Sequence, residues 1–361
     1  MLTYVLILIA LYIGWLVYEK WENDRALASF CHVIHVNGIR GKTSVCRLID
    51  AHLRGAGLKV FTKTTGSTPF YIDVAGQEHQ IRRRGGANIH EQLAMIRRAR
   101  KEGAEVLILE CMAVQPELQR TAQEQIVKGD MVVITNVRYD HIFEMGDSLE
   151  DIAESLSATV PRDGVLFTAD QDFYGFFEKK CQEKGSHAVL CREAPWTENE
   201  AIAVEVGKYL HIPEDSFREH VQGYQEDFGA CKLYELPKGP FLNLFSANDP
   251  QSTKKRLDEY QGSSPETVFL YNHRADRPDR LLLFIRHFFP LVEFREILVM
   301  GEDRSQAVRL LKKAGFDRTR EIKDWHEALE GRSGELLVGL GNIKGGAYDM
   351  LEYLEGGATH E

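Results

Sequence analysis

Residues 37–44, which read NGIRGKTS, combine the residue types that bind a phosphate group. Two glycines let backbone N–H groups approach an anion, a lysine adds a full positive charge, and a hydroxyl at Thr43 or Ser44 can bind Mg²⁺. The spacing departs from the common Walker pattern because only two residues separate the glycines, and an ordinary glycine turn is the alternative interpretation. We predict that the phosphate site comprises Asn37, Gly38, Arg40, Gly41, Lys42, Thr43 and Ser44.

The flanking sequence predicts the two elements that this segment needs. Val33, Ile34 and Val36 give the apolar, β-branched pattern of a buried strand, and residues 45–53 have the apolar spacing of a helix. The first turn of that helix would add partial positive charge to the phosphate site.

Candidate metal ligands follow the next two apolar runs. Glu110 ends the run 106–109, and Asp140 and His141 follow the run 131–135. Because the carboxyl ends of parallel strands meet at one sheet edge, we predict that Glu110 and His141 bind metal beside the phosphate loop. The alternative for His141 is a structural role in which protein neighbours accept and donate its hydrogen bonds. Cys111 fits a small buried thiol better than a nucleophile.

Two polar segments are candidates for binding substrate. Residues 63–69, KTTGSTP, form a loop too rich in hydroxyl groups to be core, and residues 82–84 are the densest basic run of the chain. Such a run can neutralise a polycarboxylate, although a solvated surface is the alternative interpretation of both segments. We predict substrate contacts from Lys63, Thr64, Thr65, Arg82, Arg83 and Arg84.

Length and composition limit the class of protein. The 361 residues are 43% hydrophobic and carry a formal net charge of −10. This length predicts two or three domains, and the negative charge argues against nucleic acid as a partner, since lysine and arginine drive that binding. The six cysteines include no CxxC pair, so they fit buried thiols in a reducing compartment.

The first residues predict a membrane anchor. Residues 2–18 carry no charge, and as a helix they would span about 25 Å, near the short end of what crosses a bilayer. We expect an uncleaved single-pass anchor rather than a signal peptide, because no basic residue precedes the apolar run. Lys20 and Arg25 follow it, which favours a position of the remaining chain on the cytoplasmic side of the cell membrane, although nearby acidic residues weaken that bias.

The C-terminal third predicts a second α/β unit. A Pro/Gly cluster at residues 237–240 precedes four apolar runs separated by helical stretches. These runs are residues 241–245, 267–271, 296–300 and 335–339.

Five segments in order, NGIRGKTS, KTTGSTP, GANIHEQ, ECMAV and TNVRYDH, make the chain resemble the ATP-dependent ligase subunit of the bacterial poly-γ-glutamate (capsule) synthase. That subunit is a relative of the Mur ligases and folylpolyglutamate synthases. The resemblance extends from residue 31 to about residue 346. It implies an α/β fold with a Mur-ligase-like P-loop central domain, a mostly parallel sheet, and a smaller Rossmann-like C-terminal α/β domain.

We therefore expect three parts. Residues 1–22 would form the transmembrane anchor, residues 30–238 the ATP-binding ligase domain, and residues 240–361 a domain that closes over the nucleotide.

The resemblance also implies roles for particular residues. Lys42 would hold the nucleotide phosphates, Thr43 and Glu110 would bind Mg²⁺ or, in its place, Mn²⁺, and His141 would bind a second metal. Mur-type ligases place a carbamate-forming lysine after the Asp-His pair, yet no lysine lies between residues 141 and 164 here. The remaining implied contacts to nucleotide or phosphate are Asn136, Lys232, Asp249, Arg274, Asp276 and Arg277.

The resulting hypothesis is an ATP-dependent amide ligase. It would phosphorylate a carboxylate and join the acyl phosphate to the amine of glutamate, extending a polyglutamate chain through γ-carboxyl linkages. A folylpolyglutamate-type or other Mur-like ligase is the alternative within enzymes, and a membrane-tethered P-loop ATPase that energises a polymer exporter is the alternative of another class. The resemblance implies small membrane subunits of the same synthase as partners. The sequence leaves open whether the chain also forms a homo-oligomer.

Overall fold

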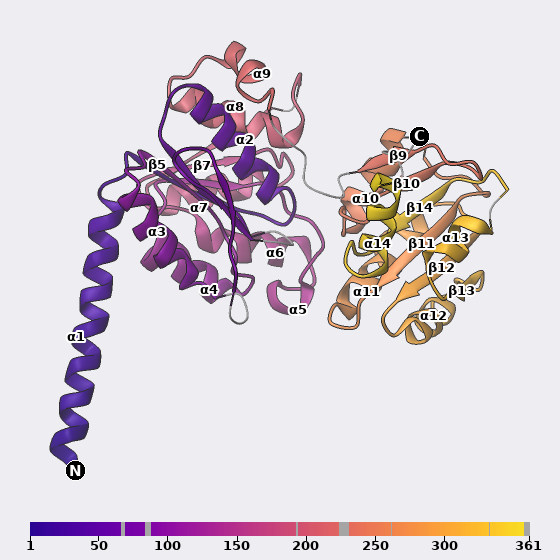
Figure 1. The fold of residues 1–361 in the computed structure, drawn as a ribbon, viewed down its shortest axis with the longest axis horizontal. Coiled ribbons are helices and arrows are strands. Elements are labelled where there is room, and N and C mark those ends of the chain that lie inside the picture. The colour runs from indigo at the N-terminus through magenta and orange to yellow at the C-terminus, as the bar shows by residue number, and fades with distance from the viewer. Residues whose placement is uncertain are drawn as a thin grey trace. The chain divides into compact units, whose positions relative to one another are not determined.

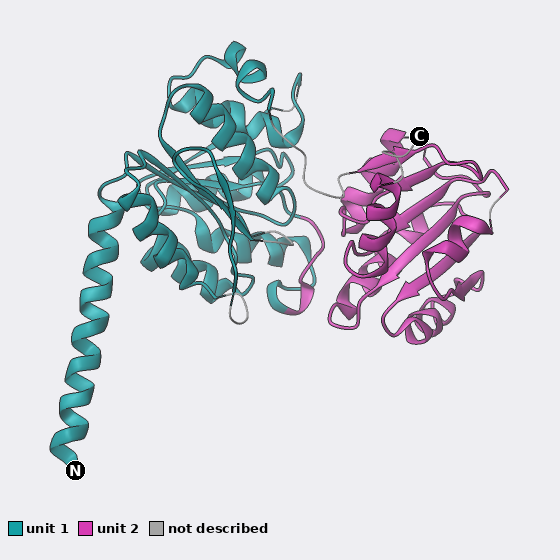
Figure 2. Ribbon diagram, viewed as in Figure 1, with its two compact units in different colours: residues 1–137, 144–225 teal, residues 138–143, 226–361 magenta. Residues whose placement is uncertain are grey.

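The computed structural model describes residues 1–65, 69–83, 88–192, 194–223, 231–260, 262–331 and 333–356. The chain divides into two compact units (Figure 2): residues 1–137 and 144–225 form unit 1, and residues 138–143 and 226–361 form unit 2. The short segment 138–143 thus belongs to a different unit from the residues on either side of it.

Unit 1 is built on an eight-stranded sheet with the order β4-β3-β2-β5-β1-β6-β7-β8. The strands are β1 (His32–Asn37), β2 (Val60–Lys63), β3 (Phe70–Ile72), β4 (Glu78–Gln80), β5 (Val106–Glu110), β6 (Met131–Ile134), β7 (Val165–Thr168) and β8 (His187–Leu190). The strands β2, β5, β1, β6, β7 and β8 pair in parallel, and the short strand β3 pairs antiparallel with both of its neighbours, β2 and β4. The mostly parallel sheet that the resemblance implied is confirmed.

Helices cover both faces of this sheet (Figure 1). The helical segments of unit 1 are α1 (Leu2–Leu27), α2 (Lys42–Gly55), α3 (Glu91–Lys101), α4 (Pro116–Thr121), the π-helix η1 (Ala122–Val127), α6 (Leu149–Leu156), η2 (Ser157–Thr159), α7 (Tyr174–Glu183), α8 (Glu198–Tyr209), η3 (Glu214–Ser216) and α9 (Phe217–His220). The short helix α5 (Ile142–Met145) begins in the segment 138–143 and ends in unit 1.

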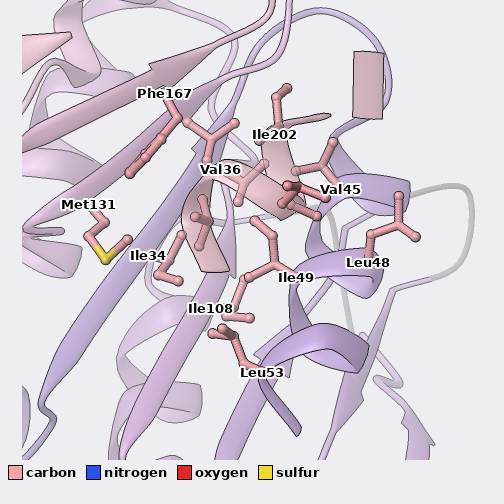
Figure 3. Packing of buried hydrophobic residues seen from close by; sticks show 14 of the residues in the cluster. Ile34, Val36, Val45, Leu48, Ile49, Leu53, Ile108, Met131, Phe167 and Ile202 are labelled. Carbon is pink, nitrogen blue, oxygen red and sulfur yellow. The ribbon is translucent and has the colours of Figure 1, made fainter. Parts of the chain in front are cut away.

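The sheet's side chains alternate between two cores, as the pleat requires. On one face Ile34 and Val36 pack against Val45 and Ile49 of α2 and Ile202 of α8 (Figure 3). On the other face, alternate strand residues pack against α3, η1 and the end of α1. Helices α2 and α3 are therefore held on opposite faces, with the carboxyl ends of β1, β2 and β5 between them.

Helix α1 has two parts with different surroundings. It is long and apolar enough to cross a membrane by length and composition, and large apolar side chains up to Tyr18 are exposed. Its last turns pack on unit 1, since Asn23 and Ala26 are buried and the Asn23 amide donates to the Ile126 carbonyl at 2.8 Å.

Unit 2 contains a six-stranded sheet with the order β13-β12-β11-β14-β10-β9. The strands are β9 (Lys232–Tyr234), β10 (Phe241–Asn243), β11 (Val268–His273), β12 (Glu296–Gly301), β13 (Thr319–Glu321) and β14 (Leu337–Leu340). The helical segments are α10 (Pro250–Tyr260), α11 (Pro278–His287), η4 (Phe289–Leu291), α12 (Arg304–Lys313), α13 (Trp325–Glu330) and α14 (Gly346–Gly356). All neighbouring strands are parallel except β9 and β10, so the second α/β unit is confirmed, and the Pro/Gly cluster joins β9 to β10 within it.

Candidate active site

The phosphate-binding loop predicted from the sequence joins β1 to α2. Gly41 is the N-cap of α2 with φ of +78°, a conformation that favours glycine. The Lys42 ammonium donates to the carbonyl oxygens of Gly38 at 2.7 Å and Ile39 at 3.3 Å. The lysine therefore lies along its own loop, beside the backbone N–H groups of the α2 N-terminus, which is the arrangement that attracts an anion.

Residues at the end of β6 fasten this loop. The Asn136 side-chain oxygen accepts a hydrogen bond from the Arg40 N–H at 3.0 Å, and the Thr135 hydroxyl donates to the Arg40 carbonyl at 2.6 Å. Asn136 is buried, and its side chain contacts the phosphate loop. A Cβ on Gly38 would lie 2.1 Å from the Thr135 hydroxyl oxygen, which leaves room only for glycine.

Asn199 also lies against the loop, and the prediction of site residues did not include it. A Cβ on Gly41 would lie 2.5 Å from the Asn199 side-chain oxygen. The N-cap of α8 is Thr197, in a capping box with Glu200, so the Asn199 amide is not needed as the cap. An asparagine in the first turn of a helix was the available signal, but it fits a plain cap equally well.

Glu110 meets the loop at the carboxyl end of β5. Its Oε2 accepts hydrogen bonds from the Thr43 hydroxyl at 3.0 Å and from the Thr65 N–H at 2.7 Å. The carboxylate is almost fully buried, at 2% exposure. A hydroxyl and a carboxylate next to a phosphate loop are the hard oxygen donors that Mg²⁺ and Mn²⁺ prefer, so the residues present fit a divalent cation.

The remaining loop residues vary in their exposure. Asn37 is buried and donates to the side chains of Gln119 at 2.7 Å and Thr159 at 3.2 Å. Ser44 is half-buried in the first turn of α2. Asn37 therefore contacts neighbouring elements beneath the loop.

Cys111 follows Glu110 and is buried. Burial raises the pKa of the Cys111 thiol to about 11. The thiol is protonated at neutral pH, as expected of an inert buried cysteine.

The predicted substrate residues differ in exposure. Lys63 is fully buried and forms an ion pair with Glu91 at 2.8 Å, and Thr64 is buried beside it. Arg83 bonds the same Glu91 carboxylate at 2.7 and 3.1 Å, whereas Arg82 is exposed. Arg84 and the tip of the loop, residues 66–68, lie outside the described residues.

His141 lies in the segment 138–143, which belongs to unit 2. Its φ is +53°, a strained value for a residue other than glycine and one that is enriched at functional sites. Its neighbour Asp140 is buried and forms ion pairs with Arg277 and with Arg280, the latter at 3.4 Å. Across the described residues, no three His, Cys, Asp or Glu side chains converge as a metal site.

The other candidates of unit 2 contact residues of their own unit. Arg274 pairs with Asp276 at 2.9 Å. Asp249 is fully buried and accepts from the Ser252 N–H at 2.8 Å at the start of α10. Lys232 lies over the Tyr234 ring, 5.0 Å from its centroid.

Arg277 stays charged where it lies. Burial by itself would lower its pKa, but Asp140 and Asp279 raise the pKa on balance. The contacts of Arg277 and Asp249 join elements of unit 2, and roles for these residues toward a nucleotide remain predictions.

Comparison with known proteins places both parts of the chain in described families. Residues 36–209 match the Mur ligase middle domain, and residues 233–357 match the poly-gamma-glutamate synthase CapB C-terminal domain. The PGA synthase CapB of Bacillus subtilis (strain 168) is 30% identical over 92% of this chain and 93% of its own length. The capsule biosynthesis protein CapB of Bacillus anthracis is 29% identical over 94% of this chain and 80% of its own length.

Solved structures support the same fold. The bifunctional folylpolyglutamate synthase/dihydrofolate synthase from Yersinia pestis CO92 has a TM-score of 0.65 at 15% identity, over 95% of this chain and 92% of that one. Folylpolyglutamate synthase of Mycobacterium tuberculosis, complexed with ADP and AMPPCP, has a TM-score of 0.62 at 13% identity, over 91% of this chain and 94% of that one. A further bifunctional synthase with Mn, AMPPNP and L-glutamate bound has a TM-score of 0.65 at 16% identity, over 95% and 93%. With the 30% identity that spans nearly all of both chains, the chain belongs to the CapB family of poly-γ-glutamate synthases.

Proposed function

We propose that the site around Lys42, Thr43 and Glu110 binds ATP with a divalent cation and phosphorylates a glutamate carboxylate for amide formation. The chain is an ATP-dependent amide ligase that forms poly-γ-glutamate. Its membership of the CapB family and its folylpolyglutamate-synthase-like fold support this function.

The reaction needs little covalent chemistry from protein side chains. A carboxylate oxygen attacks the γ-phosphorus of ATP, ADP leaves, and an acyl phosphate forms. The amine of glutamate then attacks the acyl carbon, loses a proton and expels phosphate, which leaves an amide. The protein neutralises charge and holds the reactants in place.

The contact between Thr43 and Glu110 beside Lys42 is the observation that carries this proposal. Lys42 can turn from the carbonyls of its own loop toward the nucleotide phosphates. Thr43 and Glu110 would bind the cation, which we propose is Mg²⁺ with Mn²⁺ as a substitute. A bound cation would neutralise charge that develops on the phosphates.

We propose glutamate and a growing polyglutamate chain as substrates. The folylpolyglutamate-type structure with Mn, AMPPNP and L-glutamate supports this choice, and Arg82 offers an exposed cation to a carboxylate.

The apolar part of α1 supports a membrane location. We propose that residues 2–18 anchor the chain with its catalytic body in the cytoplasm, where ATP is available. Small membrane subunits and a second copy of this chain are proposed partners.

Labelled glutamate tests the function directly. The full chain in membranes with ATP and Mg²⁺ is expected to incorporate glutamate into material that γ-glutamyl hydrolases degrade and ordinary proteases do not. Lys42→Ala is expected to abolish incorporation, whereas Lys101→Ala, a change of exposed lysine at the end of α3, is expected to retain it. Incorporation by a folded Lys42→Ala protein, or ATP turnover without amide product, would contradict the proposal.

A further inference from the structure

Lys63 is a buried charge at the edge of the proposed site. It ends β2, its side chain has no exposed surface, and its ammonium lies 2.8 Å from a Glu91 carboxylate oxygen. A buried ammonium group is costly unless it is paired. Lys63 therefore depends on Glu91, and its position beneath the surface prevents direct contact with a polymer that arrives from solvent.

Glu91 links three elements that are separate in the sequence. It is the first residue of α3, and it receives Lys63 from β2 and both Nε and Nη2 of Arg83 from the segment after β4. Burial raises the pKa of Glu91, but hydrogen bonds from Arg83 and Lys63 outweigh that effect and lower it. The carboxylate is thus ionised between two cations.

The chain neighbours of this network touch Glu110 directly. Thr65, two residues after Lys63, donates its backbone N–H to the Glu110 carboxylate at 2.7 Å. Gln92, which follows Glu91, donates its amide to the Glu110 backbone carbonyl at 3.0 Å. Movement of Lys63 or Glu91 would therefore displace donors that hold both the side chain and the backbone of Glu110.

The charges of the four groups balance. Lys63 and Arg83 supply two positive charges, and Glu91 and Glu110 supply two negative charges. Glu110 is close enough to Lys63 to act on it electrostatically. Loss of Lys63 would leave Glu91 with Arg83 as its cation and remove the ion pair that fixes the start of α3, where Gln92 holds the Glu110 backbone.

We propose that Lys63, Glu91 and Arg83 are positioning residues that hold Glu110 in the geometry required for the metal, and that Arg82 remains the exposed cation for substrate. This inference rests on the proposed function, because it takes Glu110 as a metal ligand. It assigns different roles to adjacent arginines, one facing inward to Glu91 and one exposed.

Metal binding without turnover tests the network. Binding of Mn²⁺ to the full chain is measured by electron paramagnetic resonance with a non-hydrolysable ATP analogue present. Lys63→Met is expected to weaken Mn²⁺ binding by about 10–100-fold, the usual effect of losing a group that orients a metal ligand. The KM for glutamate in the amide assay is expected to stay within about twofold, because Lys63 does not contact substrate. Lys254→Met is the matched control, since Lys254 forms an exposed ion pair with Asp258 on α10 and its loss is expected to change neither value.

Arg83→Gln is a second variant. Because the Arg83 side chain is partly exposed, its substitution is expected to disturb folding less than the substitution of buried Lys63. It is expected to weaken Mn²⁺ binding, whereas Arg82→Gln is expected to leave it unchanged. Unchanged Mn²⁺ affinity in folded Lys63→Met and Arg83→Gln proteins would overturn the inference, as would a raised KM for glutamate with normal metal affinity. If the wild-type chain binds Mn²⁺ with nucleotide but forms no amide, the proposed function fails while the metal measurements still test the network.

Discussion

The Thr43 hydroxyl lies 3.0 Å from the Glu110 carboxylate, although 67 residues separate them in the chain. Thr43 is in the first turn of α2, and Glu110 ends β5. The parallel pairing of β1 with β5 aligns Val36 with Glu110, so the loop that leaves β1 passes directly over the acid. This contact brings together the two proposed metal ligands, one from α2 and one from β5.

The first prediction concerns the oxygen donors of this pair. Glu110→Gln keeps the size of the side chain but removes its charge, so kcat for amide formation is expected to fall by on the order of 100-fold, as when a group that stabilises developing charge is lost. Thr43→Val is expected to weaken metal-dependent activity, whereas Thr43→Ser, which keeps the hydroxyl, is expected to retain most of it. Equal activity in the Val and Ser variants at limiting Mg²⁺ would show that the hydroxyl has no such role.

The second prediction concerns the shape of the phosphate loop. A Cβ on Gly38 would lie 2.1 Å from the Thr135 hydroxyl oxygen and 2.7 Å from the Thr135 backbone nitrogen. Gly38→Ala is therefore expected to displace the loop and to reduce ATP binding at least tenfold, as measured by calorimetry. Gly57→Ala is the control, because Gly57 also has positive φ but no neighbouring atom within 4 Å of the new Cβ.

Gly57→Ala is expected to cost about 1 kcal/mol of stability from backbone strain and to leave ATP affinity unchanged. Normal ATP affinity in Gly38→Ala would mean that the loop tolerates the shift and that its observed shape is not required.

The third prediction concerns the two parts of α1. Removal of residues 2–18 takes away an exposed apolar segment and is expected to leave the melting temperature unchanged. Removal of residues 2–27 also deletes the buried side chains of Asn23 and Ala26 and the Glu22–Arg97 ion pair at 3.1 Å. We expect a loss of about 2 kcal/mol and a melting temperature lower by about 4–8 °C.

Scanning calorimetry of both truncations in detergent-free buffer, with Asn23→Ala in the chain that lacks residues 2–18 for comparison, makes this measurement. Equal melting temperatures for the two truncations would show that the end of α1 is not part of the folded unit.

The fourth prediction concerns acid stability. Burial lowers the pKa of His35 to about 4, and burial together with His220 lowers the pKa of His52 to about 4. Both side chains are neutral in the fold but bind protons when unfolded, below about pH 6.5. The unfolded state therefore binds more protons between pH 6.5 and 4, so stability is expected to fall as pH decreases through that window, by up to about 2.7 kcal/mol per pH unit for two groups.

Urea denaturation across this window measures the slope. His35→Gln is expected to reduce the slope by up to half, and His326→Gln, at an exposed position, is expected to leave it unchanged. A slope that is the same in wild type and His35→Gln would exclude His35 as a source of the pH dependence.

The fifth prediction separates the two described arginines of the basic run during catalysis. Arg82→Gln is expected to raise the KM for a polyglutamate acceptor about three- to tenfold and to reduce its dependence on salt, because an exposed cation attracts an anionic polymer through screened electrostatics. The kcat at saturating acceptor is expected to change little. If acceptor KM and salt dependence match those of wild type, Arg82 is part of a solvated surface.

Several features of the site were predictable because they depend on local patterns. A glycine loop between an apolar strand and a helix predicts an anion site, and Glu110 stands out because it ends an apolar run. Parallel strands align their carboxyl ends, so the sequence also predicted that residues after β1 and β5 would be neighbours. The second α/β unit followed from its alternation of apolar runs and helical stretches.

Other features depend on contacts between distant segments. The short hairpin of β3 and β4 has no strong periodicity, and strand β9 also escaped prediction. Lys63 and Arg82 both read as cations in polar loops, yet one is buried against Glu91 and the other is exposed. The sequence did not show that the Asn136 side chain contacts the backbone of Arg40 in the phosphate loop, and its contact with a nucleotide stays a prediction.

The sequence by itself determined the main parallel strands and their helices, the phosphate loop and the acid that faces it, because backbone preferences and apolar periodicity act over a few residues. Only the tertiary structure decided which cation is buried, which amide fastens the loop, and which turns of α1 join the core. Those outcomes depend on desolvation and on the partner that another element supplies, and the free energy of a charge changes with its surroundings far more than with its place in the chain.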